Sequence, residues 1–468
     1  MDFFKALKAK DCFYPLLALA ALFVCAAMFR PLMPIDETRY MTVAWEMYVR
    51  HSFALLSVNF EPYHHKPPLL FWLINLSWAI FGVGRTSALL VIFAAACGFV
   101  LLSHRLAGVL FPAQDALRKA LPWVIVGSIP FLIYGSLVMF DVLLTVFVLA
   151  AVLTLLRLAE KPDVRLVLLA GLLTGLGVLV KGPVAGLYVF APALLYPLWR
   201  TGRHTTDYKY WYFNLVLIFL LACVPVGLWL AAVAAQSDSG FLYWLLWKQT
   251  AGRVTGSFSA AHVRPVYFYL MILPVMALPW AFFPAFWKNA KKVKAAALEK
   301  DFGIRFLLCW FVPVFLAFSV ISGKQIHYMI PLVPSVMLMI SYLLAQTDFK
   351  YIQRVAVFVV STGILAQVIA SFVFFPRYDL QPIASYVADH ADKDWAYVRN
   401  YEGELGFLGR LTIKLTDYPD KIHLPDWFKE HPNGMAVMRY KHGEELHGYN
   451  IILLMDYRGK NIAIVSLM

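Results

Sequence analysis

Long runs of apolar residues, separated by short polar clusters, fill the chain from its start to about position 375. Runs long enough to cross about 30 Å of hydrocarbon as helices lie at 13–29, 86–103, 120–140, 142–156, 166–180, 183–199, 211–235, 266–287, 306–321, 328–345 and 355–375. The pattern predicts a mainly α-helical, polytopic membrane protein with about eleven spans, and at most thirteen.

The stretch 67–82 is a further apolar candidate, and the loop charges decide how we interpret it. Basic residues concentrate in cytoplasmic loops. If 67–82 lies at the membrane surface, all the basic clusters fall on one side; if it crosses, the later ones fall on the other. The clusters are Lys5/Lys8/Lys10, Arg105/Arg118/Lys119, Arg157/Lys161/Arg165, Arg200/Arg203/Lys209, 288–305 and Lys350/Arg354. We therefore expect a juxtamembrane helix at 67–82, a cytoplasmic N-terminus and a periplasmic C-terminus in a bacterial inner membrane.

Polar and charged residues return after position 375, where no run is long enough to span. The expected elements are a helix at Gln381–Ala391, strands at Trp395–Arg399 and Ala436–Tyr440, and a hairpin of Ile451–Tyr457 with Asn461–Leu467. The sequence thus predicts a transmembrane domain at 1–375, with its first periplasmic loop at 30–85. A small periplasmic α/β domain is expected at 376–468.

The composition agrees with this pattern. Hydrophobic residues make up 61% of the chain and charged residues 15%, with a mean hydropathy of +0.67, whereas soluble domains are about a quarter charged. The net charge of +13 is explained by basic loops beside the spans, so it does not indicate nucleic-acid binding.

The first polar constellation is Asp36-Glu37-Thr38-Arg39, just after the first apolar run. Adjacent carboxylates at a membrane boundary are costly unless they are paired or used. One could act as a general base while Arg39 neutralises the other. Alternatively, Asp36 caps a helix at Thr38–Arg50.

The second constellation is Tyr63-His64-His65-Lys66, followed by two prolines. A lysine beside two histidines at the outer interface suits a phosphate, with the imidazoles binding a metal or a proton. The alternative is an interfacial anchor, in which Lys66 extends its amine to the membrane surface among aromatic rings.

Asp141 stands alone between two apolar runs. The expected topology places it at the same membrane level as Asp36, where two carboxylates would suit acid–base work on a sugar or a phosphate. Capping of the following helix is the alternative.

Basic residues recur in the other outer loops. They are Lys181, then Arg253, His262 and Arg264 within or beside the loop 236–265, and Lys324 with Tyr328 four positions later. Their excess suits an anionic ligand, and Lys324 and Tyr328 could reach one phosphate if the turn between them is helical. Lys181 alone is more typical of a structural turn, and Lys324 with Tyr328 could equally be an interfacial anchor.

Taken together, these polar residues are expected on one membrane face, where carboxylates and cations lie close to the level of a lipid headgroup. The sequence has neither a GxxxxGK[ST] phosphate loop nor a GxGxxG turn between strand and helix, which disfavours a nucleotide-driven pump. We expect an amphiphilic, anionic substrate.

These motifs resemble, in their order, the GT-C glycosyltransferases of the aminoarabinose transferase type, which are relatives of protein O-mannosyltransferases. The resemblance rests on Asp-Glu-Thr-Arg-Tyr at 36–40, Lys-Pro at 66–67, Phe-Trp-Leu-Ile-Asn at 71–75, Asp141, Lys181-Gly182, Trp247 to Arg253, His262 with Pro265 and Tyr269, and Gly323-Lys324 through Tyr328 to Pro331. It covers the membrane region, whereas the C-terminal domain carries no matching motif.

The resemblance implies a role for each matched residue. Asp36 and Asp141 would be the catalytic carboxylates, and Lys66, Arg253, Lys324 and Tyr328 would hold the donor's phosphate. Glu37, Arg39, Tyr63, Lys181 and Arg264 would line the pocket. His262 would bind a divalent metal such as zinc with His65, which stands where the related transferase has a glutamate.

We therefore expect an inverting transfer of a monosaccharide from a polyprenyl phosphate to a lipid A-like or other envelope acceptor, on the periplasmic side. This hypothesis requires the acids at 36 and 141 and the cations at 66, 253 and 324 to line one cavity. The alternative is a transporter or flippase for an anionic lipid-linked sugar, which should carry charges near mid-membrane and two similar halves.

Overall fold

The computed structural model describes residues 9–245, 263–299 and 301–468 and divides into two compact units. The first comprises 1–24, 64–70 and 88–364, and the second comprises 25–63, 71–87 and 365–468. The first loop and the C-terminal residues, far apart in the sequence, therefore belong to one unit.

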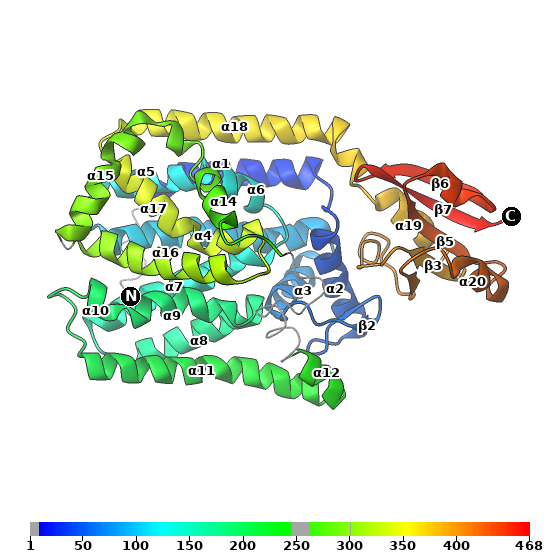
Figure 1. The fold of residues 1–468 in the computed structure, drawn as a ribbon, viewed down its shortest axis with the longest axis horizontal. Helices are drawn as coiled ribbons and strands as arrows, with labels where there is room; N and C mark the ends of the chain where they lie inside the picture. The colour runs from blue at the N-terminus through cyan, green and yellow to red at the C-terminus, as the bar shows by residue number, and fades with distance from the viewer. Residues whose placement is uncertain (1–8, 246–262, 300) are drawn as a thin grey trace. The chain divides into compact units, whose positions relative to one another are not determined.

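The first unit is helical, and its long helices lie side by side (Figure 1). In chain order the helices from the first to the last span are α1 (Ala9–Phe29), α4 (Arg85–Leu110), α5 (Asp115–Val126), α6 (Ile129–Tyr134), α7 (Phe140–Glu160), α8 (Val164–Lys181), α9 (Val184–Leu194), α10 (Tyr196–Trp199), α11 (Tyr208–Ala234), α12 (Ser239–Tyr243), α14 (Phe268–Met276), η2 (Trp280–Phe282), α15 (Pro284–Leu298), α16 (Phe302–Val320), η3 (Ile326–Leu332), α17 (Val333–Leu343) and α18 (Phe349–Val373).

Eight helical segments of the described chain are long and apolar enough to cross a membrane. They correspond to eight of the eleven predicted runs, so the mainly helical, polytopic fold is confirmed but the count of eleven spans is not. The remaining three runs, at 120–140, 183–199 and 266–287, are divided into shorter helices.

Prolines explain these breaks, because proline has no backbone N–H to donate and disfavours a helical residue before it. Pro130 stands in the first turn of α6, after α5 has ended at Val126. Pro197 stands in the first turn of α10, after α9 has ended at Leu194. Pro284 opens α15 after the short turn η2. Apolar length alone therefore overestimated the number of uninterrupted spans.

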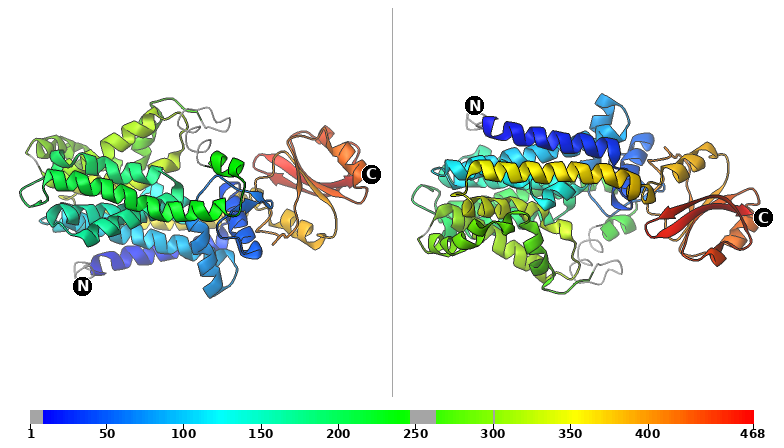
Figure 2. Two further views of the ribbon diagram at one scale, coloured as in Figure 1. Left: turned by 90° about the horizontal axis from the view of Figure 1, so that it is seen from below. Right: turned by 90° about the horizontal axis from the view of Figure 1, so that it is seen from above.

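Burial separates central helices from lipid-facing ones. In α7, 78% of the spanning window is buried, against 17% in α11 and 11% in α18. Large apolar side chains of α11 are exposed instead, among them Phe213, Phe219 and Leu228, as expected for a helix in contact with lipid. Figure 2 shows α11 as a long helix on the outside of its unit.

Two glycines four apart allow α8 to pack closely on α11. A Cβ at Gly171 would lie 2.5 Å from the Cβ of Leu221, and one at Gly175 would lie 2.5 Å from Pro225. Small residues at this spacing let membrane helices approach each other, and the contact seats α8, which ends at Lys181.

The second unit begins with the predicted first periplasmic loop. It contains α2 (Asp36–Arg50), the short hairpin of β1 (Ser57–Val58) with β2 (Glu61–Pro62), and α3 (Leu69–Phe81). At 13 residues, α3 is roughly 20 Å long and too short to cross about 30 Å of hydrocarbon. Its length agrees with the juxtamembrane helix expected at 67–82.

The C-terminal residues of this unit form a five-stranded sheet with helices on both sides. The elements are η4 (Phe375–Arg377), α19 (Gln381–Asp389), β3 (Trp395–Val398), β4 (Thr416–Tyr418), α20 (Leu424–Glu430), β5 (Met435–Tyr440), η5 (Gly443–Leu446), β6 (Tyr449–Tyr457) and β7 (Lys460–Leu467), and the strand order is β4-β3-β5-β7-β6. Strand β3 pairs in parallel with β4 and β5, whereas β7 pairs antiparallel with β5 and β6. The predicted small α/β fold is confirmed; β4 and α20 were not predicted.

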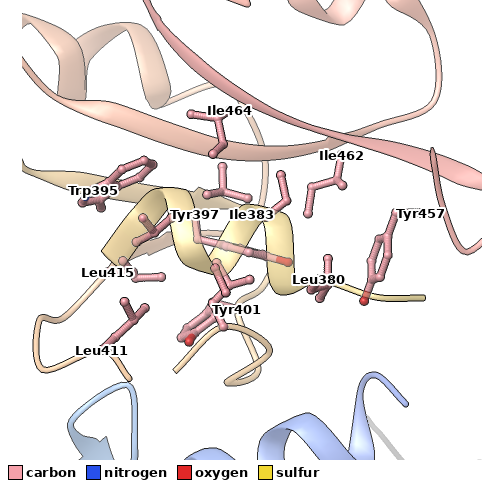
Figure 3. Packing of buried hydrophobic residues seen from close by; sticks show 14 residues of the cluster. Leu380, Ile383, Trp395, Tyr397, Tyr401, Leu411, Leu415, Tyr457, Ile462 and Ile464 are labelled. Atoms are coloured by element: carbon pink, nitrogen blue, oxygen red, sulfur yellow. The ribbon is translucent and has the colours of Figure 1, made fainter. Parts of the chain in front are cut away.

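Strand β3 is buried along its whole length because both faces of the sheet are covered. Trp395 and Tyr397 belong to a core with α19, and Ala396 and Val398 to a second core with α20. Figure 3 shows Ile383 of α19 packed among the residues of the first core. Strands buried on both faces have continuous apolar sequences, which explains the run Trp-Ala-Tyr-Val.

Residues 403–415 pack on the first loop. The Thr42 hydroxyl donates to the carbonyl of Gly403 at 2.7 Å and accepts from the amide of Phe407 at 2.9 Å. The Trp45 indole donates to the carbonyl of Leu411 at 2.8 Å. The C-terminal sheet domain and the first loop are therefore joined by specific hydrogen bonds, a relation that the sequence did not predict.

Candidate functional site

The first unit contains a buried ion pair where two spanning helices end. Asp141 lies in the first turn of α7, and its carboxylate pairs with the amine of Lys181, the last residue of α8. Their side chains are 2% and 7% exposed. The N-cap of α7 is Met139, which makes no side-chain cap bond. Asp141 thus neutralises a cation from a neighbouring helix, and Lys181 has a larger role than its short turn suggested.

Tyr328 lies beside Lys181. The Lys181 amine stands 4.6 Å from the centre of the Tyr328 ring, within the range of a cation–π interaction. The Tyr188 hydroxyl of α9 donates to the Tyr328 carbonyl at 2.5 Å. Four elements, α7, α8, α9 and η3, therefore contribute to one cluster, which we call the Asp141 cluster: Asp141, Lys181, Tyr188 and Tyr328.

Lys66 approaches the same helix end. Its amine lies 5.7 Å from the centre of the Phe140 ring, and Phe140 directly precedes Asp141 in the first turn of α7. The structure therefore brings three of the residues named from the sequence to the start of α7: Lys66, Lys181 and Tyr328.

Lys324 is held differently. It is 1% exposed, and its amine donates to the carbonyl of Arg264 at 2.9 Å and to that of Ile321. Burial lowers its pKa. Two of its three N–H donors are thus directed at backbone, and it joins the loop after α16 to the segment before α14. Arg264 itself packs its guanidinium on Phe268, 4.8 Å from the ring centre.

The second unit contains a more open network around Arg39. Its guanidinium donates to Asp36 at 2.7 Å and also pairs with Glu402. The Tyr40 hydroxyl donates to Asp36 at 3.2 Å. Asp36 begins α2 without being its N-cap, which is Ile35, so its carboxylate is held by side chains. The sequence paired Arg39 with an acid of its own motif but did not identify Glu402.

Glu37 is the buried neighbour of Asp36. It pairs with Arg30 and accepts the backbone N–H of Met33 at 2.9 Å, and its side chain is 2% exposed. These bonds fix the turn between α1 and α2. Tyr63, 4% exposed, packs its ring 6.3 Å from that of Phe71 in the same unit.

The metal expectation rests on His65 and His262. His65 is partly buried, with its ring 4.5 Å from that of His64, whereas His262 and Arg253 lie outside the described residues. Among the residues that are described, no group of three His, Cys, Asp or Glu side chains could hold a metal ion. Because catalytic zinc takes three protein ligands, we derive no chemical step through a metal.

Sequence reasoning underrated Lys181 and missed Arg30 and Glu402 as partners. One signal was available for Lys181: a single cation at the end of an uncharged span needs an opposite charge, and Asp141 begins the preceding span. Glu402 had no such signal, because it lies 363 residues after Arg39.

The chain is similar in sequence to known glycosyltransferases. Residues 65–229 match the family of dolichyl-phosphate-mannose-protein mannosyltransferases, a segment that includes Lys66, Asp141 and Lys181. The chain is 29% identical over 319 residues to the undecaprenyl phosphate-α-4-amino-4-deoxy-L-arabinose arabinosyl transferase of Pseudomonas aeruginosa (strain LESB58), covering 66% of this chain and 55% of that protein. Transferase 1 of Proteus mirabilis is 27% identical over 300 residues, or 63% and 52%. The chain thus spans about half the length of these curated relatives.

Solved structures share the fold. The crystal structure of ArnT from Cupriavidus metallidurans bound to undecaprenyl phosphate superposes with a TM-score of 0.78 over 98% of both chains, at 16% identity. The archaeal oligosaccharyltransferase AglB from Archaeoglobus fulgidus gives a TM-score of 0.55 at 12% identity, over 91% of this chain and 69% of that one. The chain is therefore a multi-pass membrane protein with the GT-C fold, and the resemblance to aminoarabinose transferase-type glycosyltransferases predicted from its motifs is confirmed.

Proposed function

We propose that this protein is a membrane glycosyltransferase that moves a monosaccharide from a polyprenyl-phosphate donor to a lipid A-like or other envelope acceptor. The reaction takes place on the periplasmic side of a bacterial inner membrane, with the N-terminus in the cytoplasm. The observation that carries the proposal is the buried ion pair of Asp141 and Lys181 beside Tyr328.

The free-energy cost of burying two charges supports a functional role for this pair. Removing two charges from water costs several kcal/mol each, which their attraction repays only in good geometry, and ionisable residues in membrane segments are commonly functional. A relative of similar fold was crystallised with undecaprenyl phosphate, a ligand whose headgroup is anionic, and the basic residues near the start of α7 suit such a group.

In the proposed reaction, a hydroxyl oxygen of the acceptor bonds to the anomeric carbon while the bond from that carbon to the phosphate oxygen breaks. Asp141 and Asp36 are the candidates for receiving the hydroxyl proton. Lys66, Lys181 and Tyr328, with Arg253 and Lys324, would stabilise the negative charge that develops on the departing polyprenyl phosphate. Attack opposite the leaving group inverts the anomeric configuration.

The test is mass spectrometry of envelope glycolipids from cells that carry the wild-type gene, no gene, or single variants. We expect one monosaccharide to be missing without the gene and in Asp36→Asn, because loss of a general base slows transfer by about 10²–10⁴-fold. Asp141→Asn should also lose it, and because this variant leaves Lys181 buried without its partner, its protein level is measured alongside. The matched control is Asp163→Asn: Asp163 caps α8 by accepting the Arg165 amide at 2.9 Å, which asparagine also does.

Unchanged glycolipids in both site variants, with normal protein levels, would refute the transferase. The leaflet on which the lipid-linked sugar accumulates distinguishes a transporter from a transferase. If the protein is a transporter, the variants leave the lipid-linked sugar on the cytoplasmic leaflet. For a transferase, the donor accumulates on the periplasmic leaflet with its sugar attached.

A further inference from the structure

The C-terminal sheet has a hollow at the edge where its parallel strands end. The cavity has a volume of about 660 Å³. It is lined by residues at or just after the carboxyl ends of β3, β4, β5 and β6, and by the first residue of β7. In α/β sheets, ligands bind outside the carboxyl ends of the strands, where backbone and loop side chains converge. No residue of the Asp141 cluster or of the Arg39 network lines this cavity.

The lining is strongly basic: Arg399, Arg439, Arg458 and Lys460 stand against the single acid Asp420. Two of the cations build the cavity wall. Arg399 pairs with Glu445, and Arg439 donates to the backbone carbonyls of Arg399 and Asn400. These bonds hold the turn after β3 in place.

The other two basic residues of the lining, Arg458 and Lys460, are positioned to contact a ligand. Arg458 lies in the tight turn between β6 and β7, Lys460 is the first residue of β7, and both are exposed. In the part of the chain that the structure describes, neither forms an ion pair with an acid. The Arg458 guanidinium instead lies 6.0 Å from the centre of the buried Tyr457 ring.

Unusual backbone conformations gather around the same cavity. Arg399, Asn400 and Arg458 have φ angles of 82°, 61° and 52°. They are three of the seven non-glycine residues with positive φ in the described chain. Arg458 shares its positive φ with Gly459 in the turn between β6 and β7, as hairpin turns of this length require. Arg399 and Asn400 are not in such a turn, and positive φ at non-glycine residues concentrates at ligand-binding sites.

We propose that this cavity binds a phosphate monoester, with Arg458 and Lys460 as its direct cationic contacts. A phosphate carries up to two negative charges and several acceptor oxygens, which complement an Arg–Lys pair at a hairpin turn. The phosphate can belong to a membrane glycolipid or to a soluble sugar phosphate. The site is independent of the proposed transfer reaction, because it uses none of the residues assigned to that reaction.

Acetylation of lysines tests the proposal on the full chain in nanodiscs of neutral lipid, with mass spectrometry as the readout. One arm adds glucosamine 1-phosphate, with glucosamine as its control. The other arm incorporates a diphosphorylated glycolipid, with the same lipid lacking phosphates as its control. We expect a phosphorylated probe to slow acetylation of Lys460 at least threefold and to leave Lys429, which is highly exposed on α20, unchanged.

Arg458→Asn should abolish this protection, since it removes the charge while asparagine tolerates the left-handed backbone at this position. Lys393→Gln removes a charge outside the cavity lining and should keep it. Protection by glucosamine 1-phosphate identifies a soluble ligand, and protection by the glycolipid alone identifies a lipid headgroup. Absence of protection in both arms, or equal protection by the unphosphorylated controls, would overturn the site. Since acetylation reports binding alone, its result is separate from that of the glycolipid assay.

Discussion

The two units hold their candidate acids in contrasting surroundings. Asp141 and Lys181 have side chains 2% and 7% exposed, whereas Asp36 and Glu402 are 49% and 42% exposed and share Arg39. A buried pair depends on each partner, because either charge alone would be unhydrated. Half-exposed acids keep part of their hydration. Substitutions that break the buried pair should therefore reduce both stability and activity. Substitutions around Arg39 should reduce activity and leave stability nearly unchanged.

The largest effect is expected from Lys181→Met. It leaves the Asp141 carboxylate buried without its cation, which costs about 3–5 kcal/mol of stability. Adding Asp141→Asn should restore most of this stability but not activity. Chemical unfolding of the full chain in detergent measures the free energy of unfolding of both variants. If the double variant is as unstable as the single one, the pair is not what stabilises this helix end.

Gly406→Ala should weaken the second unit by about 1–3 kcal/mol, the range of overpacking. A Cβ at Gly406 would lie 2.4 Å from Cγ2 of Thr42, so the C-terminal residues would be pushed from α2. Gly443→Ala is the control, since its Cβ meets nothing within 4 Å. Pulse proteolysis in urea gives the stability of each. Equal stabilities for the two variants would show that the close contact is unimportant.

A double-mutant cycle on Arg39 and Glu402 should give a coupling energy below about 1 kcal/mol, because solvent screens a half-exposed partner. The comparison pair is Lys414 and Glu61, which are 55% and 60% exposed and should couple still more weakly. Urea midpoints of the four variants in each cycle provide the energies. A coupling near that of a buried pair would remove the contrast between the units.

The smallest effect concerns pH. Burial raises the pKa of Glu404, which is fully buried, so the folded state binds its proton more tightly than the unfolded chain does. This contribution to stability is present at acidic pH and is lost as pH rises through the folded-state pKa. Glu404→Gln should flatten the decline in stability above the ordinary glutamate pKa, as read from urea midpoints. A steeper decline would contradict this sign.

Much of the fold could be predicted because its determinants are local. Apolar runs report spans directly, and the strands Trp395–Val398 and Met435–Tyr440 were visible as short apolar segments. Strand β4 was missed because Thr416–Tyr418 is short and partly exposed, with no alternating pattern. The runs at 120–140 and 266–287 were each predicted as one span, whereas the structure divides them into shorter helices. Apolarity does not reveal where proline interrupts a helix.

The sequence by itself determined the membrane class, most spanning helices, the small α/β domain, and Asp36 and Asp141 as candidate acids, since these depend on residue type and local pattern. Only the tertiary structure decided the partners. Asp141 meets Lys181 across 40 residues, and Arg39 meets Glu402 across 363. Such pairs form where helices and loops pack against each other, and no local pattern records which distant charge will arrive.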